Sequence, residues 1–159
     1  MILICYDASP TAKRAIPVAH ALLGHKPATV LHVWQPPNEF LQPDWFGGFT
    51  APAGPPIAQL ERLALDRAER ITHEGVELAR SAGFSSEPRT EPSAGSVWRT
   101  IIEVARDPDA EAIVLGALGL STVQSVLLGS VSNAVVHHSH LPVLVVPRAD
   151  ATHNVRGAA

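Results

Sequence analysis

Three glycines and two serines near the end of the chain have the types and spacing of an anion-binding loop. Gly116 and Gly119 follow a short apolar run, and after nine intervening residues come Gly129, Ser130 and Ser132. Glycine allows positive φ and close approach of a ligand to the backbone. Serine hydroxyls at a helix start add donors beside free N–H groups, which favour a phosphate. The pattern indicates a phosphate site; the alternative is that the glycines only shape a loop and the serines only cap a helix.

Asp7 is a second candidate at the other end of the chain. It ends the first apolar run and stands two residues before Ser9. A carboxylate only accepts hydrogen bonds, so it suits a ribose hydroxyl or a base amine better than a phosphate. The alternative is that Asp7 only helps to cap the helix that follows.

Two common nucleotide motifs are absent from the sequence. No G-x-x-x-x-G-K-[ST] run occurs, and the turn at residues 7–10 has no glycine, so the dinucleotide fingerprint fails as well. The glycine motif contains no lysine, arginine or paired base, and efficient phosphoryl transfer therefore lacks its usual parts.

The remaining reactive side chains predict no site. His137, His138 and His140 lack a carboxylate or cysteine placed to complete a metal site, and histidines also suit a helix C-terminus. Cys5 lies in a run predicted to be a buried strand, where an inert packing role is expected.

Alternating strands and helices must position these residues. The order predicts right-handed crossovers and a parallel sheet, in which ligands bind outside the carboxyl ends of the strands. The predicted strands are Ile2–Tyr6, Ala28–Trp34, Ser86–Glu91 (an edge strand), Glu111–Leu115 and Leu141–Val146, and the predicted helices are Pro10–Leu23, Ile57–Ala82, Val97–Arg106 and Ser130–His138.

Local signals set the helix ends and inward faces. Ser9 with Pro10 predicts a cap and first turn, Gly24 predicts a stop, and Ser96 predicts a second cap. Helical spacing assigns the inward stripes to Ala12, Ala15, Ile16, Ala19, Leu22 and Leu23 in the first helix and to Leu60, Leu63, Ala64, Arg67, Ile71 and Leu78 in the second.

The domain organisation follows from composition. Residues 1–148 are expected to form one domain, and 149–159 a flexible tail. Residues 35–56 form a loop insertion rich in proline and glycine that also carries Phe40, Trp45, Phe46 and Phe49. Either part of it folds over the domain or a partner, or it is a mobile insertion with one aromatic cluster tucked down.

Composition also limits the function classes. The 159 residues are 46% hydrophobic and 17% charged with a net charge of −3, which predicts a soluble globular protein without the basic excess of a nucleic-acid binder. No apolar run has the length of a membrane helix, and no targeting signature opens the chain, so a cytoplasmic location is expected. A single cysteine excludes an internal disulfide.

The motifs together resemble the ATP-binding subgroup of the universal stress protein family. The resemblance rests on Gly116-x-x-Gly119, nine residues, then Gly129-Ser130, and on the run from Leu127 to Val146. It also rests on the opening ILICYDAS, and it spans essentially the whole chain except residues 35–56.

The resemblance implies a fold, a ligand and a site. The fold is α/β and adenine nucleotide alpha hydrolase-like, with a five-stranded parallel sheet of order 3-2-1-4-5 and helices on both faces. Asp7 would meet the adenosine part of ATP, and Val33 would contact adenine through its backbone. Mg²⁺ would accompany the phosphates. The ribose and phosphates would be surrounded by Gly116, Gly119, Gly129 and Ser130, followed on the helix by Val131 and Ser132.

One departure bears on the phosphates. Many relatives carry an arginine or another polar residue between the first two glycines, where this chain has Ala117 and Leu118. The departure removes a possible phosphate contact.

The order 3-2-1-4-5 leaves residues 141–146 as an apolar edge strand, which predicts a homodimer through that strand. The leading hypothesis is an ATP-dependent stress sensor or regulator with an unidentified protein partner. The alternatives are a slow ATPase or autophosphorylating enzyme, and a dimeric interaction protein without nucleotide.

Overall fold

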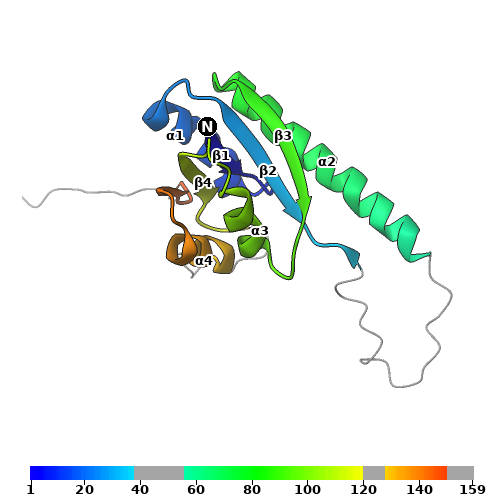
Figure 1. The fold of residues 1–159 in the computed structure, drawn as a ribbon. Coiled ribbons are helices and arrows are strands. Elements are labelled where there is room, and N and C mark those ends of the chain that lie inside the picture. The colour runs from blue at the N-terminus through cyan, green and yellow to red at the C-terminus, as the bar shows by residue number, and fades with distance from the viewer. Residues whose placement is uncertain (38–55, 120–127, 150–159) are drawn as a thin grey trace, which may run out of the picture.

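The computed structural model describes residues 1–37, 56–119 and 128–149. Strands and helices alternate along the chain (Figure 1). In chain order the elements are β1 (Ile2–Cys5), α1 (Pro10–Leu23), β2 (Ala28–Trp34), α2 (Ile57–Ser81), β3 (Ser86–Pro92), α3 (Val97–Val104), β4 (Ala112–Gly116), α4 (Ser130–His138) and β5 (Val143–Val146).

The five strands form one parallel sheet in the order β3-β2-β1-β4-β5. β1 lies at the centre, where Ile4 is paired with Val30 of β2 and Val114 of β4. The predicted fold class and strand order are therefore confirmed, including the edge position of β3. Since all strands run the same way, the ends of β1, β2 and β4 meet at one edge, called the carboxyl edge below.

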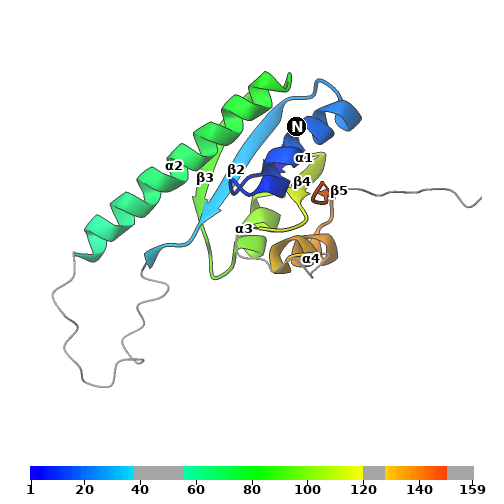
Figure 2. The same cartoon turned by 180° about the vertical axis from the view of Figure 1, so that it is seen from behind.

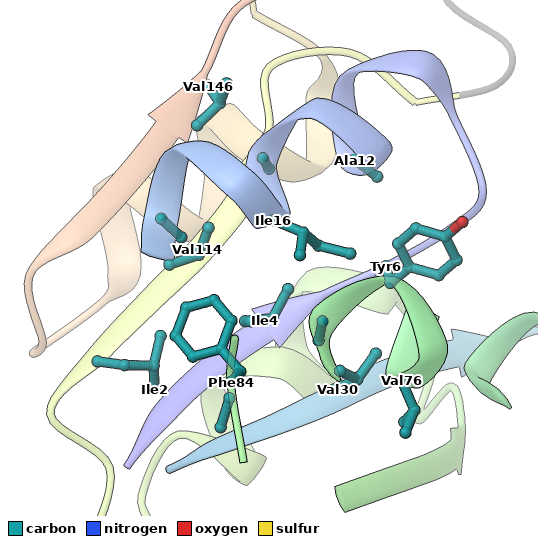
Figure 3. Close-up of a cluster of buried hydrophobic side chains, with 14 of the residues drawn as sticks. Ile2, Ile4, Tyr6, Ala12, Ile16, Val30, Val76, Phe84, Val114 and Val146 are labelled. Carbon is teal, nitrogen blue, oxygen red and sulfur yellow. The ribbon is translucent and has the colours of Figure 1, made fainter. Parts of the chain in front are cut away.

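Two apolar clusters cover the two faces of the sheet. On one face, α1 and α2 pack on Ile2, Ile4 and Val30, and Figure 3 shows Ile16 and Val76 pointing at this cluster. On the other face, α3 and α4 pack on β1 and β4 through Ile101 and Val135 (Figure 2 gives the view from behind). Burial on both sides explains why β1 and β4 are apolar at nearly every position.

The first helix begins and ends where the sequence signals place it. The Ser9 hydroxyl accepts a hydrogen bond from the Ala12 N–H, Pro10 opens the helix, and Gly24 follows it with φ of 74°. Ala12, Ala15, Ile16 and Ala19 are buried as predicted, but Leu22 is wrong, because it lies 66% exposed near the helix end.

The predicted inward face of α2 is largely wrong. The buried residues are Ala68, Thr72, Gly75, Val76 and Ala79, while Leu63 and Leu78 are exposed. The helix lies so close to the sheet that a Cβ at Gly75 would be 2.7 Å from Tyr6 Cδ1. Small residues therefore face the sheet, and the first half of α2 extends past the ends of β2 and β3 (Figures 1 and 2).

Several boundaries differ from the predictions. Tyr6 lies outside β1, α3 ends at Val104, and β5 begins at Val143 after a turn in which Leu141 N–H donates to Ser139 Oγ. Ser96 occupies the cap position of α3, but its side chain makes no capping bond, and Oγ is buried without a partner among the described residues.

Some predictions concern residues outside the described ranges. The aromatic part of the insertion lies within 38–55, and most of the expected tail lies within 150–159, both outside the described residues. The assignment to one domain over 1–148 stays a prediction. In the described part of the chain, no helix combines the length and apolarity that a membrane span requires.

Candidate functional site

The turn after β1 and the loop after β4 are bonded to each other at the carboxyl edge. The Ser9 hydroxyl donates to the Leu118 carbonyl at 3.2 Å, and the Thr11 hydroxyl donates to the same oxygen. Ala8, between Asp7 and Ser9, has φ of 63°, an uncommon conformation for a residue with a side chain. Residues more than 100 positions apart are thus held together at this edge.

A second set of bonds closes the loop onto α4. The Gly129 N–H donates to the Ala117 carbonyl at 2.7 Å, and the buried Ser132 hydroxyl donates to the same carbonyl at 2.8 Å. The Ser132 hydroxyl therefore fixes the loop, and its expected role toward a ligand stays a prediction. The Ser130 side chain is exposed, and the first N–H groups of a helix have no partner within the helix.

The three glycines act through close approach and not through positive φ. None of them has φ in the left-handed region, and Gly129 has φ of −68°. A Cβ at Gly116 would lie 2.7 Å from the Ala12 nitrogen of α1, and one at Gly129 would lie 3.3 Å from the Ala117 oxygen. The glycines therefore let β4 approach α1 and let the loop close on α4.

Asp7 holds its own turn and also faces the glycine loop. Its Oδ1 accepts a hydrogen bond from the Ser9 N–H at 3.0 Å, while the cap of α1 is the Ser9 hydroxyl. A Cβ at Gly119 would lie 3.1 Å from Asp7 Oδ2. The local turn uses one carboxylate oxygen and leaves the other beside Gly119.

One pocket of about 690 Å³, its open mouth included, lies at this edge. All the residues that the sequence and the resemblance single out line this pocket: Asp7, Val33, Gly116, Gly119, Gly129, Ser130, Val131 and Ser132. The apolar side chains of Leu31, Val97, Ile101 and Leu115 line it as well.

His32 also lines the pocket, and sequence reasoning missed it as a site residue. Its Nδ1 lies 2.7 Å from the Tyr6 carbonyl, which can only accept, so Nδ1 carries the proton. Burial lowers the His32 pKa, with Arg67 adding to the effect, while the bond to Tyr6 and the Asp7 carboxylate oppose it. The imidazole is therefore neutral near pH 7. The available signal was a polar residue inside an apolar strand, next to Val33.

Tyr6 and Cys5 also line the pocket, next to Asp7 in the sequence. The Tyr6 hydroxyl donates to Glu74 Oε1 at 2.9 Å, and burial together with this carboxylate raises the Tyr6 pKa. Burial, assisted by Asp7, raises the pKa of the Cys5 thiol to about 12. Cys5 thus stays protonated, which agrees with its predicted inert role.

The histidines near the end of α4 make an aromatic contact. The His138 ring stacks on Trp98 of α3, with ring centroids 4.6 Å apart and planes 19° apart. Trp98 therefore packs α3 against α4. Among the described residues, no group of three or more His, Cys, Asp or Glu side chains could hold a metal ion.

Known proteins are similar to this chain in both sequence and fold. The model of the universal stress protein family matches residues 1–147. A universal stress protein encoded next to a QAH/OAS sulfhydrylase in Thermus aquaticus is 33% identical over 149 residues, covering 91% of this chain and 96% of that protein. The solved structure of the hypothetical protein MJ0577 is 25% identical with a TM-score of 0.73, covering 94% of this chain and 96% of that one.

Several similar structures were solved with adenine nucleotides. A universal stress family protein from Arabidopsis thaliana with AMP bound has a TM-score of 0.61 at 17% identity, covering 94% of this chain and 92% of that one. Others contain dAMP, in the protein from Archaeoglobus fulgidus, and cAMP; both have TM-scores of 0.61 and cover more than nine tenths of this chain. At these identities the likeness is one of fold.

Proposed function

This chain belongs to the universal stress protein family, and from that premise we propose that it binds an adenine nucleotide in the pocket at the carboxyl edge and acts as a nucleotide-dependent regulator. The observation that carries the proposal is the convergence of Asp7, Val33 and residues of the glycine motif on one pocket; the motif residues are Gly116, Gly119 and Gly129 to Ser132. Three separate segments of the sequence supply these residues. Relatives that hold AMP, dAMP or cAMP support the choice of adenine nucleotides as the ligand class.

The parts of the pocket suit the parts of a nucleotide. Leu31, Val97 and Ile101 provide an apolar space for a base, and Val33 would contact the adenine through its backbone. Asp7 Oδ2 would accept a hydrogen bond from the adenosine part. The N–H groups of Ser130, Val131 and Ser132 would bind phosphate at the start of α4. ATP is the proposed physiological ligand.

Mg²⁺ fits this arrangement only through the phosphates. Asp7 is the one carboxylate among the described residues that line the pocket, and Mg²⁺ in nucleotide sites is held chiefly by phosphate oxygens and water. The ion would neutralise phosphate charge. We propose binding and signalling in place of rapid turnover, because no lysine or arginine is among these lining residues.

Assembly completes the proposal. β5 is an edge strand whose Val143, Leu144 and Val145 are only partly buried, and a second copy would cover this edge. A homodimer through residues 141–146 places the interface one short helix from the pocket. Through α4, the binding of nucleotide would then be coupled to the binding of an unidentified protein partner. The cytoplasmic location stays a prediction.

A matched pair of aspartates tests the site. Asp7 and Asp107 both accept a hydrogen bond at 3.0 Å from the N–H two residues ahead, but Asp107 lies at the opposite edge of the sheet. Asp7→Ala and Asp107→Ala remove the same kind of turn bond. Calorimetric titration with AMP and with ATP plus Mg²⁺ should show a loss of ~10-fold or more in affinity for Asp7→Ala alone, as expected for a lost charged hydrogen bond. Equal affinities in both variants and the unchanged protein would refute the site.

A further inference from the structure

The described lining of the pocket lacks the basic side chains that commonly bind phosphates. Its described lining contains one carboxylate, Asp7, and the neutral imidazole of His32, but no lysine or arginine. The residues from Gly116 to Ser132 include no charged side chain at all, and neither 38–55 nor 120–127 contains a lysine or arginine. Positive potential at the phosphate end therefore comes from the start of α4.

Two basic residues of α1 are engaged by other groups. Lys13 Nζ pairs with Glu74 at 2.7 Å, and Arg14 Nη1 donates to the Pro147 carbonyl at 2.7 Å. Arg67 contributes to the lowered pKa of His32 but is not among the lining residues. None of these three side chains is among the described residues that line the pocket.

The N-terminus of a helix stabilises only a limited amount of negative charge. The N–H groups of Ser130 to Ser132 precede the first intrahelical bond, in which the Asn133 N–H donates to Gly129 O. Such a helix end carries roughly half a positive charge. Asp7 Oδ2, which faces Gly119, adds a full negative charge on the other side of the loop.

We propose, on the basis of the proposed function, that this site selects adenine nucleotides by phosphate charge: it binds AMP more tightly than metal-free ATP, and it binds ATP more tightly as the complex with a divalent cation than without metal. One phosphate group uses the N–H groups of α4. Further phosphates find no cationic side chain among the described lining residues, and a bound Mg²⁺ removes the excess charge.

Titration of the whole protein with four ligands tests this proposal. The ligands are AMP, ADP and ATP in the presence of a chelator, and ATP with Mg²⁺ in excess. We expect affinity to fall roughly threefold for each added phosphate and ~10-fold in all, to recover with Mg²⁺, and to depend less on phosphate number at high salt. Metal-free ATP binding as tightly as AMP would overturn the charge selection while leaving the proposed function intact. If no adenine nucleotide binds, the proposed function itself fails.

A change at Leu118 gives an independent test. Its side chain lines the pocket, and only its carbonyl holds Ser9 and Thr11, so substitution leaves those bonds in place. Leu118→Arg should raise the affinity for metal-free ATP relative to AMP by ~10-fold, whereas the uncharged control Leu118→Met should not change this ratio. An unchanged ratio in a folded Leu118→Arg protein would overturn the proposal.

Discussion

At the scale of single residues, the structure assigns different work to side chains that look alike in the sequence. Ser9 and Ser132 are buried and hold the two loops through the carbonyls of Leu118 and Ala117, while Ser130 is exposed at the pocket. Asp7 uses one oxygen for its turn and leaves the other facing Gly119. Hydroxyls and carboxylates therefore have to be counted by the bonds that they already make before a ligand is assigned to them.

His32 should make stability depend on pH. Because the pKa of His32 in the folded protein lies below the ordinary histidine value of 6.5, the unfolded chain binds more protons as the pH falls. The contribution of His32 to the free energy of unfolding is fully present above about pH 6.5. Below that pH the free energy of unfolding decreases, by at most ~1.4 kcal/mol per pH unit from this group. Denaturant titrations from pH 7.5 to 5 measure it.

His32→Asn keeps a donor for the Tyr6 carbonyl but does not titrate, so its stability should decline less at low pH. His140→Asn, at an exposed position, should behave like the unchanged protein. The same pH dependence in His32→Asn and the unchanged protein would show that His32 has no such effect.

At the scale of elements, α2 has two halves with different support. From Ala68 onward it lies against the sheet, with Gly75 in contact distance of Tyr6 and Val30. Before Ala68, none of its described residues is buried, and Ile57 and Leu63 are more than half exposed. The helical pattern in the sequence is continuous across both halves and does not reveal this change.

Hydrogen exchange should divide α2 at that point. We expect amides in residues 69–81 to exchange at least ~10-fold more slowly than those in 61–67, because exposed helix without tertiary packing opens locally. Mass spectrometry of peptides from the intact protein measures both. The helix α1, whose buried face runs from Thr11 to Ala19, serves as an internal reference. Uniform protection along α2 would contradict the observed packing.

The helices α1 and α2 differ in how much of their structure the sequence alone predicts. Ser9, Pro10 and Gly24 act locally, and the bounds of α1 follow from them. The inward face of α2 did not follow, because close contact with Tyr6 favours Ala68, Gly75 and Ala79 over the leucines that dominate the pattern. Packing distance is a tertiary property that spacing does not encode.

At the scale of the whole molecule, the parallel sheet explains why the site could be found at all. Strand ends distant in the sequence meet at one edge, so residues after β1, β2 and β4 converge without any local signal. The strand order itself was implied by family resemblance. His32 was missed because its bond to the Tyr6 carbonyl joins β2 to the residue that follows β1, and sequence spacing does not report that pair.

Assembly is tested at the same scale. Size-exclusion chromatography with light scattering should give twice the mass of one chain at micromolar concentration. Val136, 46% exposed on the helix before β5, and Leu22, 66% exposed on α1, form a matched pair. Val136→Glu should weaken the dimer and Leu22→Glu should not. A monomeric unchanged protein would rule out the proposed interface.

The most direct test of the central claim is a nuclear magnetic resonance titration of the isotope-labelled protein with AMP. A nucleotide site at the carboxyl edge predicts saturable shifts in the amides of Val33, Gly116, Gly119 and Gly129 to Ser132, which line the pocket. It predicts none at Glu87 and Asp109, which lie at the opposite edge. Absence of shifts at high AMP concentration, or shifts confined to that opposite edge, would contradict a nucleotide site at the carboxyl edge.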